Sequence, residues 1–414
     1  MSNRRVETAL LVEAGRLLLE YNESTGSIHR VLARTARALT RDSCTVSVEY
    51  GGVSVSIGDD APLFQPVREL RYNMRLQSRV RGILADLQAR RLDAVAARTQ
   101  LSQALAESPR HPRGLAVSAL ALAAAALALI LGADAGAAVA AGVSTGLGLL
   151  VRQELGRRHA NLLALPLTAA LMGSLIGSAA IQLGWTASGE LALIVPALML
   201  VPGPHLINGL LDLVENYLPM SVARLTLATG ILLSSALGIV LGIELTDLEP
   251  LAVRGSGGFV RLNVLTDMAL AGIVTCGFAV FYNSAWRHVG LAALGGMAGH
   301  GTRFLALEVG CRLVVATFLG GLVVGMVSGW LARSARLPVA IVAFAGAVTM
   351  MPGLLMYRAF GGALQLAHQH ESASAALPAA TLANAFEASL VVVGLALGLV
   401  AGASFFRSDG RSAA

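Results

Sequence analysis

The sequence predicts a polytopic α-helical membrane protein of about ten transmembrane helices, preceded by a small α/β domain. Two observations lead to this prediction. The chain of 414 residues is 55% hydrophobic and only 14% charged, which is too apolar for a soluble globule of this size. Apolar segments, each near the ~20 residues that cross a bilayer, follow one another from residue 114 onward.

The N-terminal segment, residues 1–112, is expected to form a cytoplasmic α/β domain, the head. Cys44–Tyr50 and Val53–Ile57 alternate and are rich in β-branched residues, with Gly51 and Gly52 between them, and this pattern predicts a β-hairpin. Apolar residues recur at helical spacing before and after the hairpin. The predicted helices cover residues 10–21, 28–39, 71–88 and 91–107.

The rest of the chain is expected to form two membrane halves of five helices each, residues 113–245 and 260–405. Because five is an odd number, the halves must have opposite orientations in the membrane, which makes them an inverted repeat. The helices of the first half are placed at 114–132, 135–151, 162–182, 190–211 and 221–243. Those of the second half are placed at 262–284, 287–307, 309–331, 337–358 and 378–404.

Arginine determines the expected orientation, since the chain contains no lysine. Loops on one side of the predicted helices carry most of the arginines outside the head, including Arg157 and Arg158, whereas the other side has Arg254 and Arg261 beside acidic residues. The positive-inside rule then places the head, the even-numbered loops and the C-terminus in the cytoplasm, and the helices in the cytoplasmic (inner) membrane. The polar N-terminus does not have the pattern of a cleavable signal peptide.

The fourth predicted helix of each half is interrupted by Pro-Gly, at Pro202-Gly203 and at Pro352-Gly353, which lie 352 − 202 = 150 residues apart. Proline removes a helix donor, and glycine adds backbone freedom. In hydrocarbon such a break is tolerated only where the freed backbone groups face protein or a water-filled cavity. A matched pair of breaks predicts a transporter's substrate site between them. The alternative is that the two pairs only kink long helices.

Two charged residues of the second half are candidates for this site. Asp267 stands alone among apolar residues, and a carboxylate in hydrocarbon costs about 2.5–3.5 kcal/mol, so it should face the bundle interior, where it could carry a proton. Arg303 could bind a substrate carboxylate through its planar guanidinium. The alternatives are a solvated Asp267 near the outer interface and an interfacial Arg303 that pairs with Glu308 or lies among lipid headgroups.

Polar residues after the first break form a second group of candidates. His205, Asn208 and Asp212 share one helical face and could line the pathway, with Asp212 either a second proton carrier or a solvated charge at the cytoplasmic end. Three further polar residues in predicted helices could support the site or bond helices together. They are Asn283, Asn384 and Glu387.

Several functions are not expected. A chain without lysine has no phosphate-binding loop for ATP, and its cysteines and histidines lack metal-ligand spacing, so neither a cofactor nor a metal is predicted. The arginines are interpreted as topology signals and not as a nucleic-acid surface. Gly142–Gly146 matches a nucleophile-elbow pattern but lies within a predicted membrane helix, which argues against an enzyme. The sequence leaves a homo-oligomer open.

The chain also resembles the threonine/serine exporter family of bacterial and fungal membrane proteins. In the head and first half, the resemblance lies in Ala14–Glu20, Ser24–Gly26, Arg91–Asp93, Pro112-Arg113, Leu200–Asn208, Asp212 and Ala223–Leu225. In the second half it lies in Asp267, Gly277–Asn283, Gly301–Arg303, Met351–Gly353 and Tyr357. The Pro204-His205 pair departs from the more apolar residues expected there.

The resemblance implies export of small amino acids such as threonine and serine, driven by the proton gradient. The expected partners are therefore the amino acid, protons and the lipid bilayer. Related two-subunit proteins are associated with dicarboxylate export, which makes a succinate-like cargo the first alternative. A membrane protease using Asp212 and Asp267, or a channel gated by the head, are further alternatives from other functional classes.

The expected topology can be tested by cysteine labelling from outside the cell, after the three native cysteines have been replaced. A cysteine at position 157 should stay unlabelled and one at position 254 should react, because the first lies in a cytoplasmic loop and the second in an outer loop. Strong labelling at 157 with none at 254 would exclude the predicted orientation.

Overall fold

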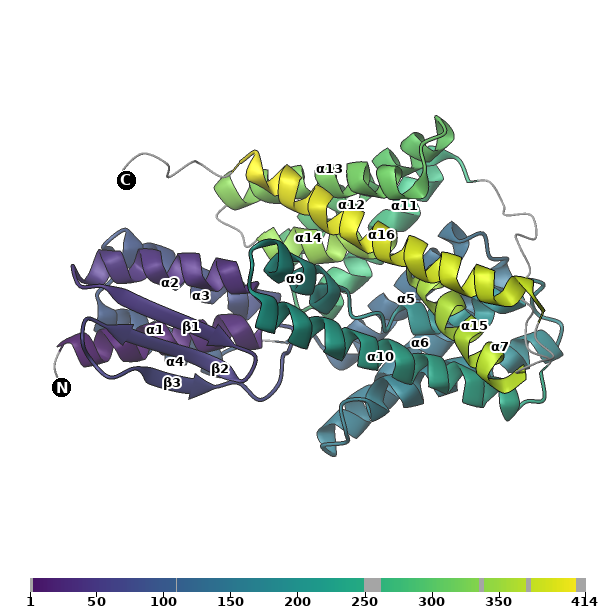
Figure 1. Cartoon of the computed structure of the whole chain (residues 1–414), viewed down its shortest axis with the longest axis horizontal. Helices are drawn as coiled ribbons and strands as arrows, with labels where there is room; N and C mark the ends of the chain where they lie inside the picture. The colour runs from purple at the N-terminus through teal and green to yellow at the C-terminus, as the bar shows by residue number, and fades with distance from the viewer. Residues whose placement is uncertain (1–2, 109, 249–261, 335–338, 370–373, 407–414) are drawn as a thin grey trace.

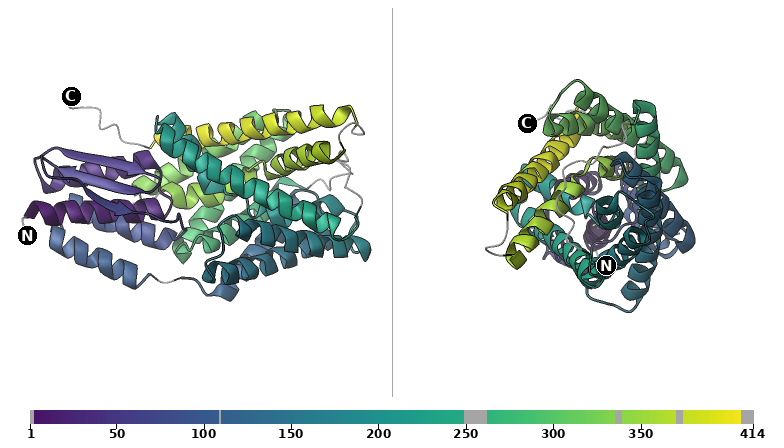
Figure 2. Two further views of the ribbon diagram at one scale, coloured as in Figure 1. Left: turned by 60° about the horizontal axis from the view of Figure 1, so that its bottom comes forward. Right: turned by 90° about the vertical axis from the view of Figure 1, so that its right-hand side faces the viewer.

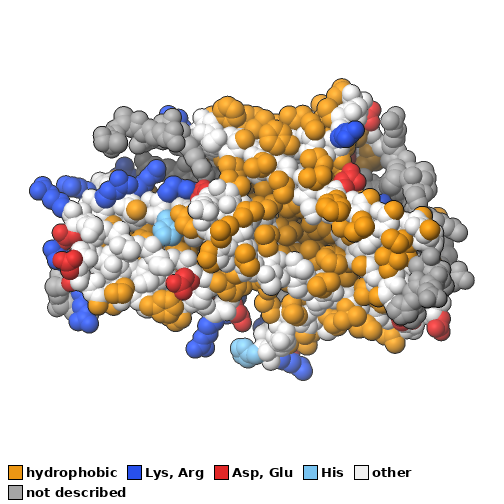
Figure 3. Space-filling view, in the orientation of Figure 1, with side chains coloured by type: hydrophobic (Ala, Val, Ile, Leu, Met, Phe, Trp, Pro, Cys, Tyr) orange, Lys and Arg blue, Asp and Glu red, His pale blue; other side chains and the backbone are white. Residues whose placement is uncertain are grey.

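The computed structural model describes residues 3–108, 110–248, 262–334, 339–369 and 374–406. Arg254 and Arg261, on which part of the orientation argument depends, lie outside these ranges. The protein is mostly helical and elongated, with the head at one end of a helical bundle (Figure 1). Hydrophobic side chains cover much of the bundle surface, whereas charged side chains gather on the head (Figure 3).

The head contains a three-stranded antiparallel sheet and four helices. The strands are β1 (Cys44–Glu49), β2 (Gly52–Ile57) and β3 (Leu63–Pro66), in the order β1-β2-β3, with Val46 opposite Val55. The helices are α1 (Asn3–Glu20), α2 (Thr25–Leu39), α3 (Met74–Gln88) and α4 (Ala94–Ala106). Hairpin and helices lie where the alternation and the helical spacing placed them; β3 was not predicted, because this short edge strand ends in proline.

The head has its own hydrophobic core, built from the apolar faces that the periodicity defines. Leu10, Leu17 and Leu18 of α1 pack with Val53 and Val55 of β2, and all five are at most 1% exposed. Side-chain caps begin two of the helices, since Asn73 accepts from the amide of Leu76 and Asp93 from that of Ala96.

The bundle is built from twelve α-helices of the described residues. Those before residue 249 are α5 (Arg113–Ile130), α6 (Ala135–Arg157), α7 (Ala164–Gln182), α8 (Gly189–Leu198), α9 (Gly203–Val214) and α10 (Leu218–Glu244). Those after residue 261 are α11 (Val264–Phe281), α12 (Trp286–Glu308), α13 (Leu313–Ser334), α14 (Val339–Ala347), α15 (Gly353–Gln369) and α16 (Ala376–Ser404). A 3₁₀ turn, η1 (Val348–Met350), extends α14.

Within the described ranges, seven helices are long and apolar enough to cross a membrane, and up to nine spans result if each bent pair is one span. The bent pairs are α8 with α9, at 60°, and the α14 segment with α15, at 55°, so both Pro-Gly breaks are present. The predicted seventh span, α12, is not among them, because it carries charged residues and many glycines. The total of ten spans therefore stays a prediction.

The six bundle helices described before residue 249 and the six described after residue 261 follow the same pattern of contacts, helix by helix. In the first set α5 contacts α6, α6 contacts α7 and α8, and α10 contacts α7 and α9. In the second set α11 contacts α12, α12 contacts α13 and α14, and α16 contacts α13 and α15. The two sets meet mainly where α5 packs against α11, with smaller contacts between α9 and α16 and between α10 and α15. α9 lies beside the head and α15 at the opposite end of the bundle (Figure 1).

Small residues allow the closest helix pair, α13 with α16, to touch backbone to backbone. A Cβ added at Gly325 would lie 2.3 Å from the carbonyl oxygen of Leu399, and one at Gly402 would lie 2.1 Å from that of Leu322. Larger side chains therefore cannot occupy these positions without separating the helices. α16 ends at the same end of the bundle as the head (Figure 2).

The turn between α1 and α2 attaches the head to the first set of helices. Asp212 of α9 accepts a hydrogen bond from the amide of Thr25, and its other oxygen lies 3.4 Å from Nε of Arg224 in α10. Arg224 also donates to the carbonyl oxygen of Glu23, at 2.8 Å. The Asp212 and Arg224 side chains are 1% and 0% exposed. A charge pair removed from water therefore lies directly beneath this turn.

A second attachment joins the head to the helices after residue 261. The amides of Met74 and Arg75 donate to the carbonyl oxygens of Tyr282 and Asn283, at 2.9 and 3.2 Å. The side chain of Asn283 donates to Oδ1 of Asn73, at 2.8 Å, and Asn283 has a left-handed backbone with φ of 56°. The head thus contacts both sets of helices.

The buried pair predicts a large effect of substituting Arg224. Arg224→Met leaves the Asp212 carboxylate buried without its counter-charge and should cost about 3–5 kcal/mol of stability. The measurement is the unfolding temperature of the detergent-solubilised protein. Arg158→Met is the control, since the pair of Arg158 with Glu154 is exposed and worth about 0–1 kcal/mol. Equal unfolding temperatures of the two variants would contradict the assignment.

Candidate functional site between the two helix breaks

The two broken helices cross the bundle in opposite directions and meet at their breaks. A Cβ added at Gly353 would lie 2.9 Å from Cδ2 of Leu198, and one at Gly203 would lie 3.4 Å from Cε of Met351. The hydroxyl of Tyr357 donates to the carbonyl oxygen of Ala197, at 3.0 Å, and this bond is buried. A side chain of one broken helix thus bonds a backbone carbonyl just before the break of the other, as a second donor beside the amide of Leu200.

A salt bridge holds the same two helices together farther from the breaks. The guanidinium of Arg358 in α15 contacts both carboxylate oxygens of Glu190 in α8, at 2.8 and 3.1 Å. Two parallel bonds of this kind fix the relative angle of the groups as well as their distance. The breaks therefore form a joined structure, which two independent kinks would not require.

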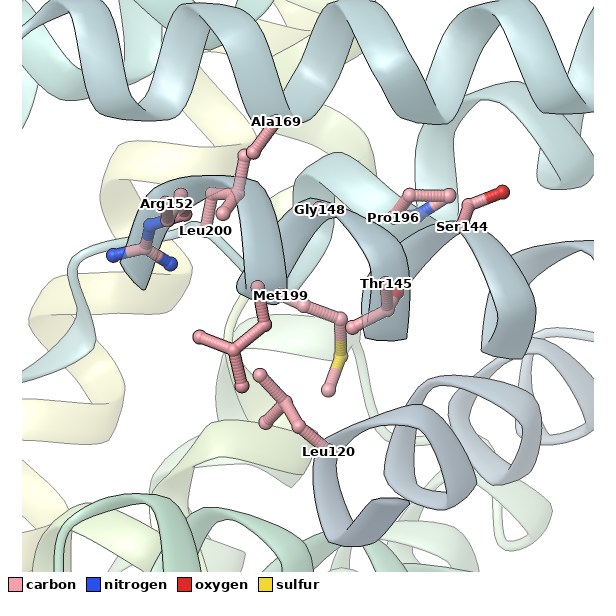
Figure 4. Close-up of a pocket in the computed structure, with 10 residues that line it drawn as sticks. Leu120, Ser144, Thr145, Gly148, Arg152, Ala169, Pro196, Met199 and Leu200 are labelled. Atoms are coloured by element: carbon pink, nitrogen blue, oxygen red, sulfur yellow. The ribbon is translucent and has the colours of Figure 1, made fainter. Parts of the chain in front are cut away.

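One side of the first break is closely packed. Figure 4 shows Pro196, Met199 and Leu200 near Thr145 and Gly148 of α6, and the space that remains there is about 10 Å³. A Cβ at Gly173 of α7 would lie 2.8 Å from Cβ of Pro196. No small molecule fits on this side, so any space beside the break must lie on the other.

The other side opens into a cavity of about 570 Å³, the site cavity. Both breaks contribute to its wall, through Gly203 and through Pro352 and Gly353. The ends of α5 and α12 and the start of α11 complete it. These ends lie away from the head, because α5 begins directly after the head and runs away from it (Figure 2). Among the described residues, three ionisable side chains line the cavity, Asp267, His300 and Arg303.

Asp267 and His300 form a buried pair in this wall. Nδ1 of His300 lies 2.6 Å from Oδ2 of Asp267, and the side chains are 6% and 5% exposed. The Nε2 atom of His300 is buried and has no hydrogen-bond partner in the described structure. Asp267 is in the first turn of α11, which Asn263 caps by accepting from the amide of Thr266. An acid and an imidazole at this distance can hold or exchange a proton between them.

Arg303 lies one turn beyond His300 on the same face of α12. It donates to the carbonyl oxygen of Thr349 in η1, at 3.3 Å, and so contacts the segment directly before the second break. Its Nε atom is buried and has no partner among the described residues. The guanidinium therefore retains a donor for a carboxylate.

The rest of the cavity wall is mainly apolar and comes from short segments of several helices. Leu127 and Ile130 of α5, Val201 at the first break, and Phe304 and Leu307 of α12 belong to it. A guanidinium, a carboxylate–imidazole pair and an apolar wall suit a small zwitterion with a short side chain.

The structure brings together some of the predicted site residues and separates others. Asp267, Arg303, Gly203, Pro352 and Gly353 line the site cavity, and Pro202 is the residue before α9. Asp212 and Asn283 contact the head as described above. Asn208 donates to the carbonyl oxygen of Asn22, and His205 packs edge-on against Tyr72, both in the head. On α16, Asn384 is half-buried and Glu387 is exposed.

His300 is the residue of this site that the sequence analysis did not select. A histidine three residues before Arg303 in a predicted membrane helix was the available signal, because the i, i+3 spacing places both on one face. The described residues contain no group of three or more histidines, cysteines or acidic residues that could hold a metal ion. Cys44, Cys276 and Cys311 are free thiols.

Comparison with known proteins identifies the family. A family model described as a threonine/serine exporter matches residues 9–246, and a second, described as "Threonine/Serine exporter, ThrE", matches residues 267–405. No solved structure matches the chain. Together the two family models cover the head and both sets of helices. The chain is therefore a multi-pass membrane protein that belongs to the threonine/serine exporter family, a family of transporters.

Proposed function

We propose that this protein is a secondary exporter that exchanges cytoplasmic threonine or serine for protons across the cytoplasmic (inner) membrane. The observation that carries the proposal is the site cavity, in which both helix breaks meet Asp267, His300 and Arg303. Arg303 would bind the carboxylate of the amino acid, and the Asp267–His300 pair would carry the proton. The head and the C-terminus would face the cytoplasm, because the arginine-rich loops lie on the side of the head.

Alternating access would come from an inverted repeat of the two membrane halves, 113–245 and 260–405. The matching neighbour pattern on the two sides of residues 249–261 supports this repeat. So does the opposite course of the broken helices, since α9 lies at the head end of the bundle and α15 at the far end. When the halves exchange conformations, the breaks become the points about which the helix ends move.

In the proposed cycle, the proton and the amino acid bind the site in alternation, because each disfavours binding of the other. With a proton on the Asp267–His300 pair, the pair has no net charge, so Arg303 leaves the cavity positive and it disfavours the ammonium group of the cargo. With the proton released to the cytoplasm, the carboxylate of Asp267 can attract that ammonium group while Arg303 attracts the carboxylate. Because only one of the two ligands is bound at a time, export of the amino acid is coupled to import of the proton.

The charge balance of the cavity favours an amino acid over a dicarboxylate. A dicarboxylate requires two positive groups, and among the described lining residues only Arg303 is permanently cationic. Asp267 would repel the second carboxylate of succinate but attract the ammonium group of threonine. The short apolar segments of the wall would accept a small side chain.

Asp267→Asn should stop proton-driven export and also weaken exchange of labelled threonine across the membrane, because asparagine neither carries the proton nor attracts the ammonium group of the cargo as a carboxylate does. Asparagine resembles the protonated acid in size but cannot change its charge, so net export should fall at least about tenfold, or ~1.4 kcal/mol. Both activities are measured in one preparation of inverted vesicles. Asp247→Asn, an exposed carboxylate at the same end of the bundle, is the control. Unimpaired pH-driven export by Asp267→Asn would exclude the proton-carrier role.

A disulfide across the breaks should block transport reversibly. The Cβ of a cysteine at 353 would lie 3.8 Å from Cβ of residue 198, close to the ~3.8 Å mean of disulfides. In a chain without its native cysteines, Leu198→Cys with Gly353→Cys should lose export on oxidation and recover it on reduction. The control pairs Leu198→Cys with a cysteine at Gly361, where an added Cβ has no neighbour within 4 Å. Export that persists in the cross-linked protein would show that the breaks need not move.

A further inference from the structure

A second cavity, of about 440 Å³, lies between the head and the membrane helices, and we call it the vestibule. Head residues of α2, of the turn before it and of α3 form one wall of the vestibule. Residues of α9, α13, α14 and α16 form the other. The vestibule is at the head end of the two breaks, whereas the site cavity extends from them toward the opposite end.

The vestibule is strongly basic. Among the described residues, four arginines line it, Arg30, Arg34, Arg81 and Arg333, and two of them are in ion pairs, which leaves 4 − 2 = 2 positive charges. Arg30 pairs with Glu215 and Arg81 with Glu23, at 3.1 and 2.9 Å.

Arg34 and Arg333 form no ion pair with any residue in the described ranges, and both are exposed. Arg34 comes from α2 of the head and Arg333 from the last turn of α13, so the two free guanidinium groups belong to opposite walls. A solute between them would contact the head and the membrane helices together.

Only a thin layer of protein separates the vestibule from the site cavity. On α9 the vestibule reaches Ile207 and the site cavity reaches Gly203, while along the second broken helix the corresponding residues are Phe344 and Val348. Four residues of helix span about 6 Å. Ile207 and Phe344 are each 2% exposed, so they fill this layer. Ile207 lies about one turn after the first break and Phe344 about two turns before Pro352, so both belong to helix ends that can move without the rest of the helix.

We infer that the vestibule is the cytoplasmic entrance of the pathway, and that Arg34 and Arg333 bind the carboxylate of the cargo there before it passes Ile207 and Phe344. This inference rests on the proposed function. Guanidinium groups bind carboxylates through paired hydrogen bonds, and a recessed site with excess positive charge raises the local concentration of anionic groups. The head thereby supplies part of the binding site for the cargo.

The test compares the two faces of the membrane. In inverted vesicles, which present the vestibule to the medium, Arg34→Gln and Arg333→Gln should raise KM for threonine about tenfold, the loss of ~1.4 kcal/mol expected for one charge-assisted contact, with kcat little changed. In right-side-out vesicles, KM for threonine entering from the outer face in exchange should stay at the wild-type value. Arg37→Gln, one turn along α2 and outside the vestibule lining, is the matched control.

Chemical rescue separates a binding role from a structural one. Arg34→Cys should also raise the cytoplasmic KM, and modification with a thiol reagent that adds an ammonium group should lower it again, whereas a sulfonate reagent should raise it further. Threonine in the medium should slow both modifications. The inference would be overturned if KM for threonine rose equally on both faces of the membrane, or if it did not change with the charge of the reagent. Wild-type vesicles that do not transport threonine at all would instead refute the proposed function.

Discussion

The need to satisfy backbone polar groups inside a membrane governs this structure. A helix interrupted in hydrocarbon exposes amides and carbonyls that lipid cannot bond, and each unpaired group costs several kcal/mol. Here neighbouring helices bond the carbonyls beside the breaks: Tyr357 of α15 bonds that of Ala197, and Arg303 of α12 bonds that of Thr349. The breaks are therefore stabilised by the helices around them, and the space beside them holds the ionisable groups of the cavity.

Sequence patterns located the breaks and the two charged residues beside them because their physical basis is local. Pro-Gly interrupts a helix wherever it stands, and a carboxylate or guanidinium in an apolar run must find an interior partner, as Asp267 and Arg303 do. The apolar segments of about 20 residues likewise placed most helices of the bundle. It did not give the end of α6, which continues to Arg157, six residues beyond the predicted boundary at 151.

Contacts between distant segments could not be predicted in the same way. His205, Asn208 and Asp212 share a helical face, but periodicity does not say what that face contacts, and the structure places it against the head. The partner of Asp267 was missed for the same reason, since His300 is 33 residues away and becomes a neighbour only when α11 packs against α12. The strand β3 depends on pairing with β2 and has little signal of its own.

The double attachment of the head has a consequence for the speed of any motion between the two sets of helices. Thr25 and Asn22 are bonded to α9, while Met74 and Arg75 are bonded to the residues that follow α11. If the sets shift relative to each other, one group of bonds must break or the head must deform. At about 0.5–1.5 kcal/mol each, two such bonds amount to about 1–3 kcal/mol, or roughly a 5- to 150-fold change in rate. The head then slows the motion between the two sets of helices. A ligand or partner that weakened either attachment would raise the rate of this motion without contacting the membrane helices.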